Sequence, residues 1–397
     1  MNSAILHAHY LPIPATPPPL SLYVHIPWCV RKCPYCDFNS HHAPADIPEQ
    51  EYVSALLHDL ELALPLIWGR RITSIFIGGG TPSLFSGAAI DRLLCGVRAL
   101  LPLEPGAEIT LEANPGTAEA QRFFDYRAAG VNRLSLGIQS FNDRHLTALG
   151  RVHDSHSARM AIDMAAAHFD NFNLDLMYGL PDQSMEACLA DLHEALSFQP
   201  SHLSCYHLSI EPNTTFHLRP PVLPDDDTCA DMQQNIEQYL AAAGYAHYET
   251  SAFARQRRMS RHNLNYWQFG DYLGIGAGAH SKLSGQLGIL RQQRQPHPRH
   301  YMEQCAHDQP VLNERRLTRE ETGFEFMMNA LRLVDGVDVA LFTERTNLPL
   351  NILEHALRQA EQRGLLSRDT SRLAPTLRGQ RFLNDLLELF LPDHEYA

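Results

Sequence analysis

Three cysteines near the start of the chain limit what this sequence can fold into more than any other feature. Cys29, Cys33 and Cys36 have the spacing C-x3-C-x2-C and follow an apolar run at residues 22–26. A strand followed by a tight loop can direct three thiolates toward one point. Three thiolates can hold three corners of a [4Fe–4S] cluster, which normally takes four cysteines. The fourth iron would then be open, and an open metal position is a site for chemistry.

Three other interpretations of these cysteines stay open at this point. A structural zinc site would need a fourth ligand, which His25, His41 or His42 could supply. Two thiols could form a disulfide and leave the third one free. Finally, the chain has eight cysteines, so three of them could lie close together by chance. The spacing alone does not decide between these interpretations and an open cluster.

The chain from residue 21 alternates short apolar strands with amphipathic helices. Strands are expected over residues 21–26, 73–77, 108–111, 133–138, 173–177 and 202–210. Helices are expected over residues 49–64, 87–101, 118–129, 143–149, 157–168, 184–198 and 226–243. Such alternation predicts an α/β fold with a parallel sheet and right-handed crossovers. Six units predict a partial (β/α)6 barrel rather than the closed barrel of eight.

Polar residues and glycines recur where the expected strands end. The cysteine loop follows the first strand, and the other residues in this position are Gly78, Gly79, Gly80, Thr81, Glu112, Gln139, Asp175, His207 and Glu211. In a (β/α) barrel the carboxyl ends of the strands form one rim, where active sites lie. We therefore expect these side chains to share a site with the cysteines, although each alone could be a helix cap or loop contact.

The last third of the chain departs from this repeat. Residues 245–254 are expected to form another strand, residues 257–281 do not fit the alternation, and residues 292–300 are predicted to be a linker. Helices over 318–333, 350–363 and 379–391 and a hairpin within 364–375 resemble a winged-helix module. Thr318 and Glu321 have the spacing of a capping box. We therefore predict a leader over 1–20, a barrel domain over 21–290 and a second domain over 300–397.

Composition excludes some classes of function and location. The net charge of −13 argues against a general nucleic-acid binder, so the winged-helix module is expected to serve as a cap or partner surface. The proline-rich leader has neither a charged start nor a long apolar run, so a signal peptide and a membrane span are not expected. A cytoplasmic protein with reduced cysteines is predicted. The remaining cysteines are expected to be buried small apolar side chains: Cys95, Cys188, Cys205, Cys229 and Cys305.

Several motifs together resemble one protein family. An aromatic residue, Tyr35, precedes the third cysteine, as in the radical S-adenosylmethionine (SAM) signature. The further motifs are YVHIPWC at 23–29, CPYCDF at 33–38, GGGTP at 78–82, GIQSF at 137–141, DLMYGLP at 175–181 and GIGAGAHS at 274–281. They resemble the coproporphyrinogen III dehydrogenase branch of the radical SAM proteins, from about residue 21 to the end of the chain.

This resemblance implies cofactors and the residues that bind them. The cluster would be held by Cys29, Cys33 and Cys36, and SAM would contact Tyr23, Gly79, Gly80, Thr81, Glu112, Gln139, Arg151 and Asp175. The chemistry of these residues agrees with such a ligand. Glycines let the backbone come close to it, carboxylates can accept hydrogen bonds from ribose or ammonium groups, and Arg151 could pair with its carboxylate. An electron donor would reduce the cluster, which would pass an electron to SAM and break its sulfonium C–S bond. The cofactors would carry out this difficult step, and the protein would hold them in place.

Two features favour the heme chaperones of that branch over its oxidases. The oxidases carry a fourth cysteine where this chain has Phe38, so coproporphyrinogen oxidase activity is not expected. The HNLNYW sequence at residues 262–267 matches the H-N-x-x-Y-W element associated with heme binding in the chaperones. His262 would ligate heme iron, while Tyr266 and Trp267 could cover the macrocycle. A histidine in a chain with 22 of them can equally be a structural residue.

The leading hypothesis is therefore a cytoplasmic chaperone that holds heme and delivers it to apo-hemoprotein clients. Peripheral contact with membrane hemoproteins is one form that this delivery could take, and whether SAM is cleaved stays open. The alternative is an oxygen-independent coproporphyrinogen III oxidase of porphyrin biosynthesis. A winged-helix regulator would explain the end of the chain but not the barrel motifs.

Overall fold

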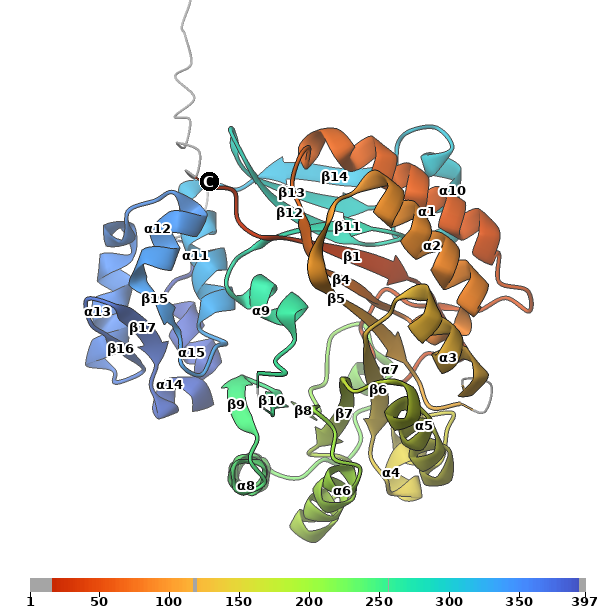
Figure 1. The fold of residues 1–397 in the computed structure, drawn as a ribbon. Helices are drawn as coiled ribbons and strands as arrows, with labels where there is room; N and C mark the ends of the chain where they lie inside the picture. Colours follow the sequence, from red (N-terminus) through yellow and green to blue (C-terminus); the bar gives the residue numbers. More distant parts are fainter. Residues whose placement is uncertain (1–15, 117–119, 256, 393–397) are drawn as a thin grey trace, which may run out of the picture.

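The computed structural model describes residues 16–116, 120–255 and 257–392. Residues 1–15 of the predicted leader lie outside them. Figure 1 shows a large α/β part and a smaller, mostly helical part formed by the end of the chain, with helix α9 (Arg261–Trp267) between them. No helix among the described residues is long and apolar enough to cross a membrane.

Six neighbouring parallel strands form the partial barrel that the sequence predicted. They are β1 (Leu20–Ile26), β4 (Ile72–Gly79), β5 (Leu103–Ala113), β6 (Arg133–Gln139), β7 (Phe172–Tyr178) and β8 (His202–His207). The partners run parallel in every pair from β1 to β8. Alternate side chains such as Leu22, Ile75 and Leu111 are fully buried, which explains why the sequence of these strands is apolar.

Helices cover the outer face of this sheet. They are α1 (Glu49–Ala63), α2 (Gly87–Leu100), α3 (Ala120–Ala129), α4 (Asp143–Ala148), α5 (Ser155–His168), α6 (Met185–Ser197) and α8 (Asp226–Ala242), with short 3-10 turns at Leu64–Leu66 and Pro82–Leu84. The four-residue helix α7 (Thr215–Leu218) lies instead against the cysteine loop, where the N–H of Phe216 donates to Pro34 O at 2.9 Å. Several helices begin at a side-chain cap: Ser86, Asp154 and Ser184 each accept a hydrogen bond from the first turn of their helix. These caps fix where each helix starts after its strand.

The sheet extends beyond the predicted barrel on both sides. Strand β11 (Asp271–Ile275) lies parallel to β1, and β12 (His280–Gly285), β13 (Gly288–Arg294) and β14 (Val311–Arg316) continue it in antiparallel order. On the other side, the single strand expected over residues 245–254 is instead a hairpin of β9 (Ala246–Glu249) and β10 (Ala252–Ala254), with β10 paired to β8.

The prediction of a linker over residues 292–300 is wrong. Those residues end strand β13 and begin helix α10 (Pro298–Cys305). These residues are polar and therefore looked like a linker, but some of them are buried against polar partners from distant parts of the sequence. The guanidinium of Arg294, only 1% exposed, binds the carboxylate of Asp59 at 3.0 Å. The buried ion pair therefore ties the outer strands to helix α1.

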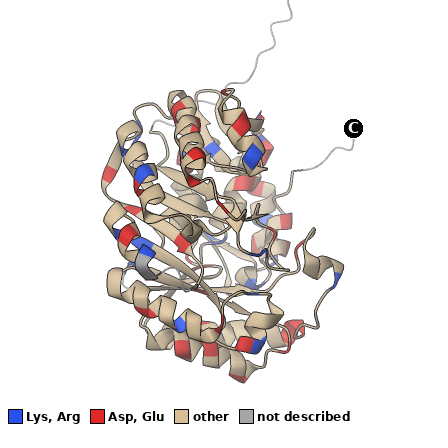
Figure 2. Cartoon of the chain, turned by 90° about the vertical axis from the view of Figure 1, so that its right-hand side faces the viewer, with Lys and Arg blue, Asp and Glu red and all other residues tan. Residues whose placement is uncertain are grey.

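The end of the chain forms the second, winged-helix-like part. Its elements are α11 (Arg319–Ala330), β15 (Val337–Asp338), α12 (Val339–Thr346), a 3-10 turn (Leu350–Leu353), α13 (Glu354–Gln362), β16 (Leu366–Arg368), β17 (Arg372–Pro375), α14 (Leu377–Arg381) and α15 (Leu383–Glu388). The capping box of Thr318 and Glu321 is confirmed. The last helix is divided at Phe382, contrary to the prediction, and helix α12 was not expected. In the view of Figure 2, basic and acidic residues are interspersed over the helices.

Candidate functional site

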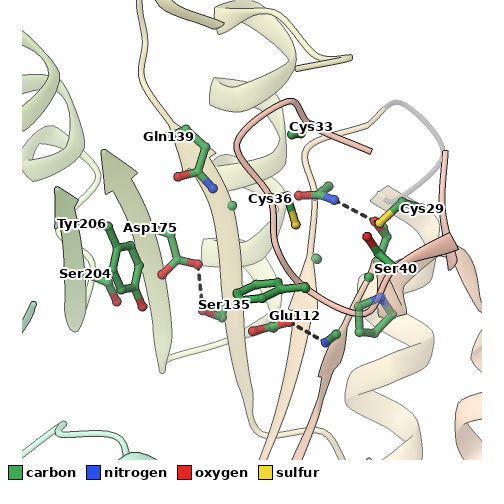
Figure 3. A pocket seen from close by; sticks show the side chains of 18 of the residues that line it. Cys29, Cys33, Cys36, Ser40, Glu112, Ser135, Gln139, Asp175, Ser204 and Tyr206 are labelled. Atoms are coloured by element: carbon green, nitrogen blue, oxygen red, sulfur yellow. Dashed lines mark hydrogen bonds between the residues drawn. The ribbon is translucent and has the colours of Figure 1, made fainter. Parts of the chain in front are cut away.

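The three cysteines of the loop line one cavity with a volume of about 280 Å³. Cys29 ends the short strand β2 (Trp28–Cys29), which pairs with β3 (His41–His42), and a turn from Cys33 O to Cys36 N closes the loop at 3.1 Å. All three thiols are free and half-buried, so the disulfide interpretation is wrong. Figure 3 shows them on one side of the cavity, opposite Gln139 and Asp175.

Two of the three histidines considered as zinc ligands, His25 and His41, are engaged elsewhere. The two ring nitrogens of His25 form hydrogen bonds with Tyr23 Oη at 2.9 Å and Asn39 O at 2.8 Å. His41 Nε2 lies 3.2 Å from Pro296 O, and none of the three histidines lines the cavity of the cysteines. Within the part of the chain that the structure describes, no three or more His, Cys, Asp or Glu side chains lie close enough together to hold a single metal ion. Three free thiols on one cavity wall remain a donor set that fits an iron–sulfur cluster.

A hydrogen-bond network connects two of the cysteines with the rim of the barrel. Thr81 Oγ1 donates to Cys29 Sγ at 3.5 Å, and Asn114 Nδ2 donates to Thr81 Oγ1 at 2.9 Å. Arg151 donates to Asn114 Oδ1 at 2.5 Å and to Cys33 Sγ at 3.7 Å. The guanidinium charge therefore lies beside the thiols, where it favours their deprotonated form as cluster ligands. Burial acts in the other direction and raises the pKa of the Cys29 and Cys36 thiols.

Two carboxyl groups, Glu112 on β5 and Asp175 on β7, line the same cavity. Glu112 Oε2 accepts a hydrogen bond from the backbone N–H of Gly79 at 3.0 Å. Burial and, after it, the charge of Asp175 raise the pKa of Glu112 to about 8. Asp175 accepts hydrogen bonds from Asn173 at 2.8 Å and Ser135 at 3.2 Å, while burial raises its pKa. The cavity thus offers acceptors that a cationic ligand would stabilise in their charged form.

Gln139 presents an acceptor without a partner. The pairing register of β6 shifts between Gly137 and Gln139, and Gln139 has a φ of 70°. Its Oε1 is buried and has no hydrogen-bond partner among the described residues. A buried amide oxygen left without a donor is costly, so a ligand with N–H or O–H groups would satisfy it. SAM carries both kinds of group, which makes this observation a fit to the predicted cofactor.

The glycines at the end of β4 are required by the packing of the protein itself. A Cβ at Gly79, whose φ is +116°, would lie 2.6 Å from the ring of His25, and a Cβ at Gly80 would lie 2.6 Å from Trp28 O. The space that these glycines leave is filled by the protein itself. They let β4 approach the start of the cysteine loop, and so they hold the two walls of the cavity together.

A second, larger cavity of about 1120 Å³ adjoins the first one. The two share lining residues Phe38, Phe76, Gly79, Glu112 and Asn263. The larger cavity is bounded by the sheet on one side, by α9 on another and by Glu325 of α11. From α9 it receives His262, Asn263, Tyr266 and Trp267.

Comparisons with known proteins agree with this arrangement. The family model of the Radical SAM superfamily matches residues 23–195, and that of the HemN C-terminal domain matches residues 317–382. The chain is 50% identical to heme chaperone HemW of Escherichia coli K12 over 95% of this chain and 99% of that protein. It is 33% identical to heme chaperone HemW of Bacillus subtilis over 94% of this chain and 99% of that protein. The chain belongs to the HemW family of radical SAM proteins.

A solved structure supports the same fold for this HemW-family chain. Coproporphyrinogen III oxidase (HemN) from Escherichia coli, a radical SAM enzyme, superposes with a TM-score of 0.79 and 25% identity. The match covers 94% of this chain and 90% of that one. The chain therefore shares the barrel and the C-terminal part with an enzyme of this branch.

Most of the predicted SAM residues of this HemW-family chain lie together, but not all. Gly79, Gly80, Thr81, Glu112, Gln139, Arg151 and Asp175 line the smaller cavity. Tyr23 lines the larger one, with its hydroxyl held by His25. His207 and Glu211 line neither cavity: the His207 ring stacks on Tyr178, and Glu211 binds the nearby Ser209. Cys95 is exposed, contrary to the prediction, whereas the other four cysteines outside the loop are buried.

Several residues of the smaller cavity were missed in the sequence, among them Asn114 and Arg133. Asn114 directly follows strand β5, and the other rim residues also come where a strand ends. Its position at the end of a strand could therefore have identified it. Arg133 begins strand β6, at the opposite end of the barrel. A charged residue at the start of a strand usually faces solvent, but Arg133 is six residues before Gln139 on the same strand, so the alternation of side chains already predicts one face for both.

Proposed function

We propose that this protein is a heme chaperone, which binds a [4Fe–4S] cluster and SAM in the smaller cavity and heme in the larger one. It would receive electrons from a donor and deliver heme to apo-hemoproteins in the cytoplasm. The names of the HemW relatives support this function, as does the sequence identity over nearly the whole chain. The observation that carries the proposal is the large cavity next to the smaller one, whose wall carries histidines, His262 among them, and six Phe, Tyr or Trp residues.

The smaller cavity supports the binding of the two radical SAM cofactors. Cys29, Cys33 and Cys36 would hold the cluster, which supplies the electron that cleaves a sulfonium. Arg151 lies against Cys33, where it can pair with the carboxylate of SAM. Glu112 and the free oxygen of Gln139 are placed to accept its ammonium or ribose protons. The protein's own contribution is to orient the ligand and exclude water.

The larger cavity supports the binding of a flat apolar ligand. Its volume exceeds the upper end of ordinary ligand pockets, about 1,000 Å³. Tyr266 packs against Tyr272 at 4.8 Å and against Trp267 at 5.0 Å between ring centroids, which gives an aromatic wall. His262 is 8% exposed, and Ser74 binds its Nδ1 at 3.2 Å. Its other nitrogen is left for a ligand, and burial lowers the pKa of His262 to about 3, which keeps the imidazole neutral as iron ligation requires.

A hemin titration tests this function. Anaerobically reconstituted protein should develop a Soret band, which His262→Ala should weaken by about tenfold or more in affinity because the iron loses its ligand. His156→Ala is the matched control, since this exposed histidine lines neither cavity. His280 also lines the larger cavity, so His280→Ala belongs in the same series. If that variant loses the band and His262→Ala keeps it, the assignment of the ligand is wrong. Transfer is then measured as a Soret shift when the hemin-loaded protein meets an apo-hemoprotein.

The similarity to HemN favours a second candidate, an oxygen-independent coproporphyrinogen III oxidase. Against it stands Phe38, which occupies the position of the oxidases' fourth cysteine, is 60% exposed and lines both cavities. Reduced protein with SAM and coproporphyrinogen III should release no carbon dioxide. If the wild-type protein releases carbon dioxide and binds no hemin, the chaperone function is wrong and the oxidase function takes its place.

A further inference from the structure

A buried arginine in the smaller cavity has no hydrogen-bond partner among the described residues. Arg133 is 2% exposed, and its Nε is buried without an acceptor. Neither a hydrogen bond nor a salt bridge joins its guanidinium to any other residue that the structure describes. A buried charge is ordinarily paired, because its desolvation costs several kcal/mol, about 2–7 even for a neutral polar group. This guanidinium is therefore directed at a cavity that lacks its partner.

Arg133 lies deep in the barrel rather than at the rim. It begins β6, whose last residue is Gln139, so the two α-carbons are separated by roughly 20 Å along the strand. Arg151, at the rim, contacts Cys33 and serves the ligand beside the cluster. The deep guanidinium is thus a second cationic group, and it is separate from the one assigned to SAM.

The charge of Arg133 acts on both carboxyl groups of the cavity and opposes the rise of their pKa, but neither group forms a hydrogen bond or a salt bridge with it. Asp175 accepts its hydrogen bonds from Asn173 and Ser135, and Glu112 accepts one from Gly79 N–H. The pKa of Glu112 is about 8, so this group is mostly protonated at neutral pH. The positive charge of Arg133 extends as far as His262, whose pKa it lowers in addition to the effect of burial. An anion reaching this region from the larger cavity would be stabilised.

The passage between the cavities also presents a polar group. Asn263, directly after His262, lines both cavities, and its side-chain amide makes no hydrogen bond with any residue that the structure describes. Its side-chain amide can donate to a group that passes from one cavity to the other. A ligand in the larger cavity could therefore extend an arm past Asn263 toward Arg133.

We propose that Arg133 binds a carboxylate arm of a tetrapyrrole held in the larger cavity, and that Asn263 contacts the same arm in the passage. A propionate has the right chemistry, because a guanidinium and a carboxylate form paired, charge-assisted hydrogen bonds. The inference rests on the proposed function for the class of ligand. It adds an anchor that fixes which edge of the macrocycle faces the SAM cavity.

The test compares protoporphyrin IX, which has no iron, with its dimethyl ester, whose propionates carry no charge. Wild-type protein should bind the acid roughly tenfold to a hundredfold more tightly than the ester, the effect of a hydrogen bond to a charged group. Arg133→Met should remove this preference, Arg133→Lys should keep part of it, and Asn263→Ala should reduce it. Arg144→Met, a change of an exposed arginine that lines neither cavity, should leave it unchanged. Iron content after reconstitution reports whether each variant is folded.

Several results would overturn the inference. Equal binding of acid and ester by the wild type would do so, as would an acid preference that persists in Arg133→Met. If Arg133→Met does not fold, an undiminished preference in both Arg133→Lys and Asn263→Ala overturns it. Loss of SAM binding in Arg133→Met, with the porphyrin preference retained, would assign the guanidinium to SAM instead. Protoporphyrin IX needs no iron ligand, so its binding is independent of hemin ligation. If hemin gives no Soret band but the preference for the acid still depends on Arg133, the chaperone function is rejected and the inference about Arg133 stands.

Discussion

Among single residues, Glu112 couples the charge of the smaller cavity to pH. Its carboxyl belongs to the cavity wall, and burial and Asp175 raise its pKa to about 8. At pH 7 the free protein therefore keeps a proton on Glu112. A ligand with an ammonium and a sulfonium favours the charged carboxylate and lowers its pKa. We expect SAM binding at pH 7 to release up to about one proton, and SAM affinity to rise between pH 6 and pH 8.5.

Calorimetry in two buffers with different ionisation enthalpies measures this proton release, and Glu112→Gln should abolish it. The same variant reports on stability. The folded state holds a proton on Glu112 that the unfolded state loses near its ordinary pKa of about 4.3. This contribution is fully present below that pKa and is lost as the pH rises through about 8. The variant should therefore gain stability relative to the wild type as pH rises over this interval. Binding enthalpies that do not depend on the buffer would contradict the assignment.

At the scale of elements, helix α9 is held in place by contacts with the barrel rather than by its own stability. It has only seven residues, too few for a stable isolated helix. Glu108 on β5 accepts hydrogen bonds from the backbone N–H groups of Arg261 at 3.0 Å and His262 at 3.3 Å. At the other end, Asn265 Nδ2 donates to Ser21 Oγ at 2.9 Å. These contacts fix His262 against the larger cavity.

Removal of the Glu108 carboxylate should therefore weaken hemin binding. Glu108→Ala leaves two backbone N–H groups without an acceptor and should cost about 1–3 kcal/mol of stability. Because α9 contributes to the larger cavity, hemin affinity should fall more than SAM affinity. Glu104→Ala is the matched control, since Glu104 is on the same strand and its carboxylate makes only a half-exposed contact with Arg261 at 3.4 Å. Equal losses in the two variants, measured by thermal unfolding and hemin titration, would show that Glu108 does not position the helix.

The same element shows why part of the fold was not predictable from the sequence. The barrel strands were predicted because every second side chain, such as Leu22, Leu111 and Leu134, is apolar and fully buried. Helix α9 and strand β13 have no such pattern, because their polar side chains are buried against partners from distant segments. Arg294 meets Asp59, and Asn265 meets Ser21, across more than 200 positions of the sequence. The rim residues were predictable because they end their strands, whereas Arg133 begins its strand, and only its even spacing from Gln139 indicates the inner face.

At the scale of the whole molecule, the barrel and the C-terminal part share an apolar core. Phe269 and Ile289, which belong to the barrel part, are buried with Phe326 and Phe342 of the C-terminal part. The side chain of Arg332 lies over the Trp267 ring at 4.4 Å. Arg381 binds Glu237 of helix α8 at 2.7 Å. The C-terminal part is therefore a wall of the larger cavity, and its packing decides the position of α9 (Figure 1).

Loss of this shared core should weaken the whole protein and the larger cavity together. Phe326 is 1% exposed, and its ring contacts those of Phe269 at 5.6 Å and Phe342 at 5.0 Å between centroids. Phe326→Ala should cost about 3–5 kcal/mol, the range for a buried phenylalanine, and should weaken hemin binding. SAM binding, which depends on the barrel rim, should change less.

The control is Phe382→Ala, a change of the same chemistry in the same part of the molecule at a residue that is 54% exposed. It should leave both unfolding and hemin binding nearly unchanged. Differential scanning calorimetry of the apo-protein distinguishes a shared core from two independent ones. With a shared core, the wild type unfolds in one transition, and Phe326→Ala moves that whole transition to lower temperature. Two transitions, of which Phe326→Ala moves only one, would mean that the C-terminal part folds by itself, and then its packing would not determine where α9 lies.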